Sequence, residues 1–236
     1  MFIVNIFLIL LFVIVFSDLY INYFPKSKLV LVPLDFKLRK KDSNIEMVID
    51  LKITNKSKSK ETMVSNLYLD IDFFKGKNNQ YIKELNYEES IYIYTGSIKK
   101  NINNYWPTTI IKANSEILIQ VILKFKNSDL KNKIKYLWLK VFWDNYGHFG
   151  ITKKQDAFLV NFNRHNEKKK ELIQIPLKQG YKAIAVKTDL LGSFDNPIET
   201  VMKYCKDVAK KNDILTIGET PLAIMQGRYI APQNLE

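Results

Sequence analysis

Residues 45–54, IEMVIDLKIT, alternate between apolar and polar side chains along almost their whole length. The odd positions are all apolar, whereas Glu46, Asp50, Lys52 and Thr54 stand between them. A period of two is typical of a β-strand that buries one side and exposes the other. This stretch therefore predicts a half-buried strand in a sheet that covers a core.

The same alternation returns along the chain between residues 28 and 163. It is carried by three further sets of apolar residues: Leu67, Leu69, Ile71 and Phe73; Ile117, Ile119, Val121, Leu123 and Phe125; and Leu137, Leu139, Val141 and Trp143. Turn signals rich in Asn, Gly and Ser separate these runs. Six to eight short strands at such spacing predict an immunoglobulin-like β-sandwich over residues 28–163, without the Cys-Trp-Cys arrangement of antibody domains.

The residues of this β-rich region offer little chemistry. The two histidines, His148 and His165, have no nearby carboxylate pair, which is not typical of a metal site. The three tryptophans, Trp106, Trp138 and Trp143, fit packing better than a binding platform. The region is therefore expected to act as a spacer or an interaction module.

Composition narrows the class of protein. The chain has 236 residues, of which 47% are hydrophobic and 25% charged, with a formal net charge of +12. Its lysines are dispersed and accompany no groove-reading or stacking motif, so no nucleic-acid partner is expected. The single cysteine, Cys205, excludes an intrachain disulfide and a multi-cysteine metal site.

The N-terminus is strongly apolar. Residues 2–16, FIVNIFLILLFVIVF, contain one polar residue, and aromatic residues continue to Phe24. A small-x-small cleavage site is missing, so residues 1–24 are predicted to form a retained transmembrane anchor with the lipid bilayer as its partner. Lysines follow the span and none precedes it, which predicts a single-pass membrane protein with its bulk in the cytoplasm.

The pattern changes after residue 163. A charge run (RHNEKKKE) predicts a linker over residues 164–172. Residues 183–187 and 213–217 are short apolar runs that predict strands, and between them Asn196, Pro197 and Glu199 mark a helix start. The fold class predicted for the whole chain is thus mainly β with a small α/β tail: an N-terminal transmembrane helix, a β-sandwich and a first strand-helix-strand unit.

The tail also carries a resemblance. VKTDLLGSFDNPIETVMKYCKDVAKKNDILTIGETPLAIMQGRYIAP resembles a cyanobacterial group related to coenzyme F420-0:gamma-glutamyl ligase, whose members share the anchor and β-module layout. Residues 173–236 are accordingly expected to begin a ligase-like α/β domain. Thr220 matches a loop hydroxyl of the family, and Gln226, Gly227 and Arg228 match its Glu-Gly-Arg element. The resemblance implies that these four residues bind substrate or nucleotide.

For a full-length ligase the resemblance implies GTP- and divalent-metal-dependent addition of glutamate to a deazaflavin. This sequence departs from the family where Ile224 replaces a lysine and Gln226 replaces an acid. Because most metal and nucleotide ligands of the family lie further downstream, no metal ligand or cofactor is expected in this chain, and the catalytic residues are left unassigned.

Two function hypotheses stay open. The first is that the chain is the N-terminal portion of a membrane-anchored ligase-like protein with a truncated catalytic domain, inactive by itself. The alternative is a non-enzymatic, membrane-tethered β-sandwich that binds a protein partner. A third, an extracytoplasmic adhesion or lipid-binding sandwich, is disfavoured by the charges that flank the apolar N-terminus.

Overall fold

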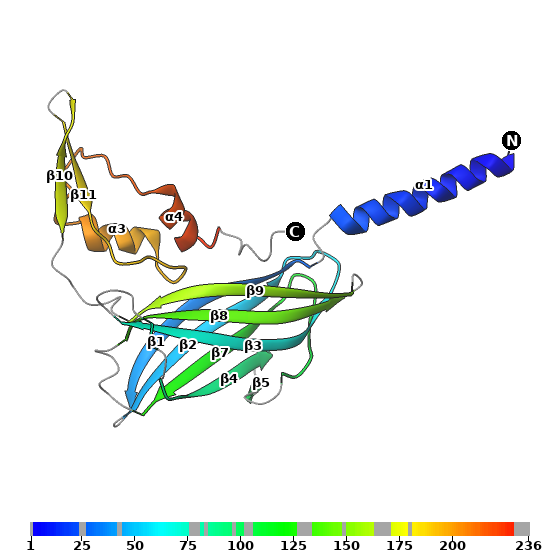
Figure 1. Ribbon diagram of the computed structural model, residues 1–236, viewed down its shortest axis with the longest axis horizontal. Coiled ribbons are helices and arrows are strands. Elements are labelled where there is room, and N and C mark those ends of the chain that lie inside the picture. Colours follow the sequence, from blue (N-terminus) through cyan, green and yellow to red (C-terminus); the bar gives the residue numbers. More distant parts are fainter. Residues whose placement is uncertain are drawn as a thin grey trace.

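The computed structural model describes residues 2–23, 27–41, 44–75, 81–82, 85–95, 98–101, 106–126, 134–147, 150–162, 171–178 and 181–228. Two antiparallel sheets face each other and form a β-sandwich (Figure 1). One sheet has the strand order β1-β2-β7-β4-β5 and the other β6-β3-β8-β9. The strands of the first sheet are β1 (Leu29–Lys41), β2 (Asn44–Asn55), β7 (Glu116–Phe125), β4 (Tyr87–Thr95) and β5 (Ile98–Asn101). Those of the second are β6 (Thr109–Ile111), β3 (Thr62–Lys75), β8 (Ile134–Gly147) and β9 (Gly150–Asn161).

The alternation of residues 45–54 corresponds to strand β2. Met47, Ile49, Leu51 and Ile53 are completely buried, and Ile45 is 8% exposed. β2 pairs with β1 on one side and with β7 on the other, so its buried side faces the second sheet. The periodicity thus predicted this strand, and the structure confirms its position within a sheet.

Aromatic side chains pack among the aliphatic residues of the core between the sheets. The ring of Phe125 lies 5.7 Å from that of Phe73 and 6.1 Å from that of Tyr87, measured between centroids. Trp106 and Trp143 are buried as well, whereas Trp138 is 44% exposed. Packing therefore accounts for two of the three tryptophans.

Helix α1 (Phe2–Tyr23) extends away from the sandwich (Figure 1) and exposes large apolar side chains from Val4 to Phe16. Within the part of the chain that the structure describes, no helix combines the length and the apolar character that crossing a membrane requires. The prediction of a transmembrane helix over residues 1–24 is therefore wrong. The physical reason is that Ser17 and Asp18 follow Phe16 inside the helix, so the apolar run stops short of the roughly 20 residues that a bilayer core needs.

The C-terminal part consists of a β-hairpin and two short helices. The hairpin pairs β10 (Leu172–Pro176) with β11 (Lys182–Val186), and it is followed by α3 (Pro197–Cys205) and α4 (Glu219–Met225). The predicted start of α3 is confirmed: the side chain of Asn196 accepts hydrogen bonds from the backbone N–H groups of Ile198 and Glu199 at 2.8 and 3.3 Å.

The first strand and the helix of the predicted strand-helix-strand unit are confirmed as β11 and α3, whereas its second strand is wrong. β11 pairs with β10 in an exposed hairpin, and residues 213–217 form no strand; Ile214 in that stretch is 90% exposed. An apolar run becomes a strand only where another strand satisfies its backbone N–H and C=O groups, and the described residues place none beside it. Of the predicted linker 164–172, residues 164–170 lie outside the described residues, and Leu172 already belongs to β10.

Candidate functional site

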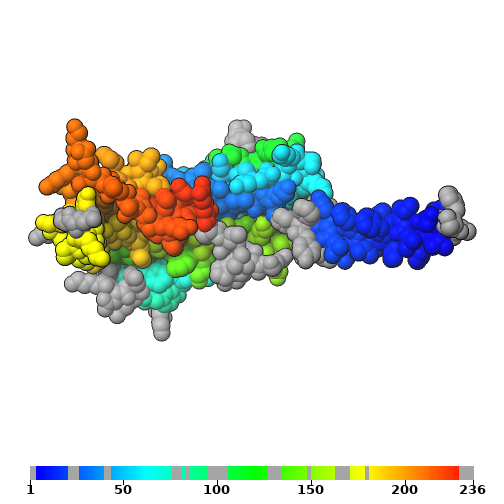
Figure 2. All heavy atoms as spheres, turned by 90° about the horizontal axis from the view of Figure 1, so that it is seen from above, coloured from blue at the N-terminus to red at the C-terminus, as the bar shows by residue number. Residues whose placement is uncertain are grey.

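The C-terminal part contacts the sandwich through the loop before α3. The side chain of Phe194 is 8% exposed, and its ring packs edge-on against those of Phe36 and Phe158 at centroid distances of 5.5 and 6.2 Å. Phe36 belongs to β1 and Phe158 to β9, which are edge strands of the two sheets. Phe194 therefore enters the core between the sheets. The hairpin that precedes it in sequence lies at the end of the molecule away from α1 (Figure 2).

Gly192 allows this close approach. A Cβ atom at Gly192 would lie 2.8 Å from the backbone oxygen of Leu159 and 3.2 Å from the Cβ atom of the same residue. Real Cβ atoms do not come so close to backbone, so a side chain at this position would push the loop away from β9. The backbone N–H of Gly192 donates to the carboxylate of Asp195 at 2.8 Å, which fixes the turn.

Polar contacts hold the same loop from its other end. The ammonium of Lys135 lies 3.5 Å from the carboxylate of Asp189, and both side chains are largely buried. The Tyr204 hydroxyl donates to that carboxylate at 3.4 Å and accepts from the Asp189 backbone N–H at 3.1 Å. Burial raises the pKa of Tyr204; the hydrogen bond with the Asp189 backbone opposes this shift, and the Asp189 charge adds to it. Burial alone would lower the pKa of Lys135, but its contacts with Tyr136 and Asp189 outweigh burial and raise it.

The loop before α3, the helix itself and Asn161 of β9 line a partly open cavity of about 180 Å³. Its lining includes the carboxylates of Asp189, Asp195 and Glu199 and the polar side chains of Asn161 and Thr200. No set of three or more His, Cys, Asp or Glu side chains among the described residues is placed to hold a metal ion. Asp189 already contacts Lys135 and Tyr204, and Asp195 accepts from Gly192, so this donor set does not fit a divalent metal.

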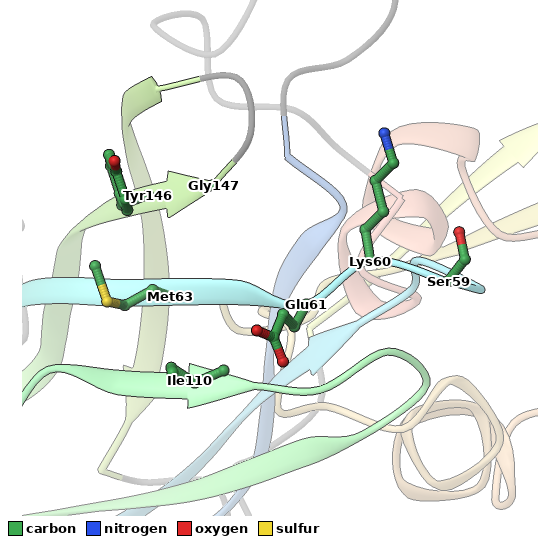
Figure 3. Close-up of a pocket in the computed structure, with 7 residues that line it drawn as sticks. All are labelled: Ser59, Lys60, Glu61, Met63, Ile110, Tyr146 and Gly147. Carbon is green, nitrogen blue, oxygen red and sulfur yellow. The ribbon is translucent and has the colours of Figure 1, made fainter.

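A second, more open groove of about 510 Å³ lies beside strands β3, β6 and β8 (Figure 3). The side chains of Lys60 and Glu61 point in different directions at its rim, and Met63, Ile110 and Tyr146 form its apolar wall. A small-molecule site usually has polar groups that converge on one point. This groove lacks such convergence and is no candidate for catalysis.

The four predicted site residues lie in and directly after α4. Thr220 belongs to the helix, and Gln226, Gly227 and Arg228 form its C-terminal cap. The N–H of Gly227 donates to the Ile224 carbonyl at 3.0 Å, and that of Arg228 donates to the Ala223 carbonyl at 2.8 Å. These bonds and the positive φ of 65° at Gly227 define a Schellman motif.

The Schellman motif explains why a glycine stands between Gln226 and Arg228: these three residues end helix α4. α4 contacts α3 where the Thr200 hydroxyl lies 3.6 Å from the sulfur of the buried Met225. Thr200 also lines the cavity, which places α4 next to it. The binding of substrate or nucleotide by Thr220, Gln226, Gly227 and Arg228 stays a prediction.

We expect Gly227→Ala to destabilise α4 by about 1–2 kcal/mol, because an L-residue in the left-handed region carries a cost of that size. Amide hydrogen exchange of residues 222–228 measures the change. Gln226→Ala, one position earlier at a negative φ of −88°, is the matched control and should leave exchange nearly unchanged. Equal effects of the two substitutions would contradict the capping role.

A titratable group lies on β9, the strand that contacts Phe194. Burial raises the pKa of the Asp156 carboxyl from 3.8 to about 6, and the charge of Lys154 opposes the shift. A raised carboxyl pKa means that the folded state holds the proton more tightly than the unfolded state. Its stabilising contribution is complete below pH 3.8 and is lost as the pH rises through 6.

We therefore expect Asp156→Asn to remove a pH dependence. Relative to the variant, the original chain should lose about 2–3 kcal/mol of unfolding free energy between pH 4 and pH 7. Urea denaturation at several pH values measures the difference, and Asp70→Asn on the outer surface serves as the control. A constant difference between the chain and the Asp156 variant across this range would contradict the assignment.

The sequence did not point to the residues that join the C-terminal part to the sandwich. Phe194, Gly192 and Asp189 contact residues more than thirty positions away, and no local period marks such contacts. One signal was present: a glycine and a phenylalanine stand just before the capped start of α3. A large apolar residue at a helix entry often packs onto a neighbouring surface.

A family comparison matches residues 30–164 to the F420-0:gamma-glutamyl ligase N-terminal Ig-like domain. The chain belongs to this family. The match covers the sandwich, which we call the Ig-like domain from here on, and supports the resemblance at that level. It includes neither α1 nor the C-terminal part, and it supports neither a cyanobacterial origin nor membrane anchoring.

Comparison with curated proteins found no match. Solved structures resemble the Ig-like domain weakly. The ApaA protein of Bordetella pertussis is 10% identical, with a TM-score of 0.34, over 58% of this chain and 96% of its own. The GAE domain of GGA2p from Saccharomyces cerevisiae is 13% identical, with a TM-score of 0.28, over 56% and 97% of the two chains. Likenesses of this size carry no argument about function.

Proposed function

We propose that the Ig-like domain of this chain is a platform that anchors the beginning of a gamma-glutamyl-ligase-like part, and that this chain alone has no ligase activity. The carrying observation is the docking of Phe194 between β1 and β9. The loop before α3, which follows the Ig-like domain in sequence, thereby packs against the core of that domain. Family membership of residues 30–164 supports the link to ligases.

The surface of the C-terminal part supports the proposal further. Within residues 171–178 and 181–228, Phe194 and Met225 are the only large apolar side chains that are buried. Ile173, Ile198 and Ile214 are 61%, 75% and 90% exposed. Apolar surface on this scale usually marks a contact with another protein surface. The body of a ligase domain, which these residues would introduce, is the partner that we propose for it.

The implied cofactors belong to that ligase body. The described residues offer no metal-binding set, and Ile224 stands where the family has a lysine that could meet phosphate or carboxylate. In this proposal the chain holds the ligase-like part in place, and the residues that bind GTP and a divalent metal belong to the ligase body.

The test is an activity assay of the purified chain with GTP, Mg²⁺ or Mn²⁺, radiolabelled glutamate and a deazaflavin acceptor. We expect incorporation no higher than in the reaction without protein, with an authentic ligase as positive control. GTP-dependent incorporation by this chain that is abolished by Arg228→Ala would overturn the proposal of inactivity. It would also show that the predicted site residues are functional.

An interaction module is the second candidate, and the outer side of the second sheet favours it. Tyr68 and Phe142 stack there at 4.8 Å, and Trp138 on the same strand as Phe142 is 44% exposed. Aromatic side chains are enriched in protein interfaces. A partner bound at this surface should be lost with Trp138→Ala and retained when residues 213–236 are deleted; the reverse result would locate the contact in the C-terminal part.

A lipid bilayer stays our proposal for the partner of residues 1–24. The large apolar side chains from Val4 to Phe16 are exposed along α1, and such surface is unfavourable in water. The proposal concerns contact with lipid, not a crossing of the bilayer. Flotation with phosphatidylcholine vesicles should carry the full chain and leave a chain without residues 1–24 behind; equal flotation of both would contradict it.

A further inference from the structure

Three polar side chains occupy neighbouring positions inside the Ig-like domain, near the adjoining ends of β8 and β9. The indole nitrogen of Trp143, both amide atoms of Asn145 and the hydroxyl of Thr152 are buried and have no hydrogen-bond partner among the described residues. Trp143 is 2% and Asn145 0% exposed. The adjoining ends of β8 and β9 lie at the end of the sandwich that is nearer α1 (Figure 1).

The strand register brings these groups together. Asn145 of β8 lies directly opposite Thr152 of β9, and Trp143 lies two positions before Asn145 on the same side of β8. Directly opposite residues of an antiparallel pair have Cβ atoms about 5 Å apart. The side-chain polar atoms nevertheless form no hydrogen bond with one another.

Another buried asparagine in the same domain has hydrogen-bond partners for its side-chain nitrogen and oxygen. The side chain of Asn55, also 0% exposed, donates to the carbonyls of Lys60 and Ile111 at 3.0 Å each and accepts from the N–H of Ser57 at 2.9 Å. A buried amide without such bonds costs free energy comparable with the bonds that it lacks. Asn145 therefore requires a partner that the surrounding side chains do not supply.

We infer that Trp143, Asn145 and Thr152 bind one internal water molecule. Water both donates and accepts, and it suits a polar site with two to four partners. The indole N–H of Trp143 and the Asn145 amide donate to the water oxygen, and the water hydrogens go to the Asn145 carbonyl oxygen and the Thr152 hydroxyl. The bound water joins the ends of β8 and β9, next to the start of β1, where Lys154 donates to the carbonyl of Ser27 at 3.0 Å.

The three tryptophans allow a test with internal controls. In the ¹⁵N-labelled full chain, the indole N–H of Trp143 should show a nuclear Overhauser effect to a long-lived water. Trp106, whose indole donates to the Val64 carbonyl at 3.0 Å, should show none. Hydrogen exchange at the Trp143 indole should be slower than at the 44% exposed Trp138, by on the order of 100-fold.

Two variants make the test specific. Thr152→Val together with Asn145→Leu should abolish the water signal at the Trp143 indole, whereas Thr152→Ser, which keeps the hydroxyl, should preserve it. Thr152→Val alone changes the shape of the side chain least and should weaken the water signal. This single variant provides the test if the double variant does not fold. Absence of a water signal in the original chain, exchange at Trp143 as fast as at Trp138, or an unchanged signal in Thr152→Val would each overturn the inference.

Discussion

Phe194→Ala is expected to release the loop before α3 from the Ig-like domain. The substitution removes a side chain that is 8% exposed and packs against two other aromatic rings. Truncating a core phenylalanine typically costs 3–5 kcal/mol, and we expect about 3 kcal/mol here because the vacated space opens toward the surface. At 1.4 kcal/mol per tenfold, this increases the population of the undocked loop roughly 100-fold.

Limited proteolysis measures that population, because a protease cuts the loop only when it is undocked. Ile198→Ala is the matched control, since Ile198 lies a few residues further on and is 75% exposed. The control should be cut at the rate of the original chain. If Phe194→Ala and Ile198→Ala were cut equally slowly, Phe194 would contribute nothing to docking.

Phe125→Ala is expected to destabilise the Ig-like domain itself. Phe125 lies at the end of β7, is 1% exposed and contacts the rings of Phe73 and Tyr87. Because the residues around a deleted core side chain relax only partially into the cavity, we expect a loss of about 3–5 kcal/mol in the free energy of unfolding. Such a loss is a large part of the stability of an ordinary domain, which is about 5–15 kcal/mol.

Urea denaturation followed by tryptophan fluorescence measures this loss, since two of the tryptophans are buried in the same domain. Tyr68→Ala offers the contrast, because Tyr68 stacks on Phe142 but is 52% exposed on the outer side of the sheet. It should cost no more than about 1.5 kcal/mol, the size of an aromatic pair. A larger loss for Tyr68 than for Phe125 would contradict the placement of the core.

Local pattern predicted the Ig-like domain and the start of α3. In β2 the apolar positions of residues 45–54 are buried as the alternation required, because a strand exposes alternate residues to opposite sides. Asn196 and Pro197 mark a helix start by bonding and dihedral preferences that depend on neighbouring residues alone. The apolar alternation and the helix-capping residues can each be recognised from a few neighbouring positions of the chain.

Features that depend on distant residues could not be predicted in this way. Residues 213–217 have the apolar character of a strand, but strand formation depends on a partner, and the described residues provide none. The docking of Phe194 depends on Phe36 and Phe158, which approach each other only after the two sheets have formed. For α1, composition indicated a membrane span, whereas the apolar run is interrupted at Ser17 and Asp18.

The central claim is that the Ig-like domain holds the first segment of the C-terminal part through residues 189–195. Amide hydrogen exchange of the full chain tests it most directly, since in this segment the N–H of Asp189 donates to the Tyr204 hydroxyl of α3 and the N–H of Gly192 donates to the Asp195 carboxylate. Protection of these amides, lost in Phe194→Ala while β7 and β8 stay protected, is the predicted result. Exchange of residues 189–195 at the rate of an unstructured peptide in the original chain, with the same strands protected, would contradict the account.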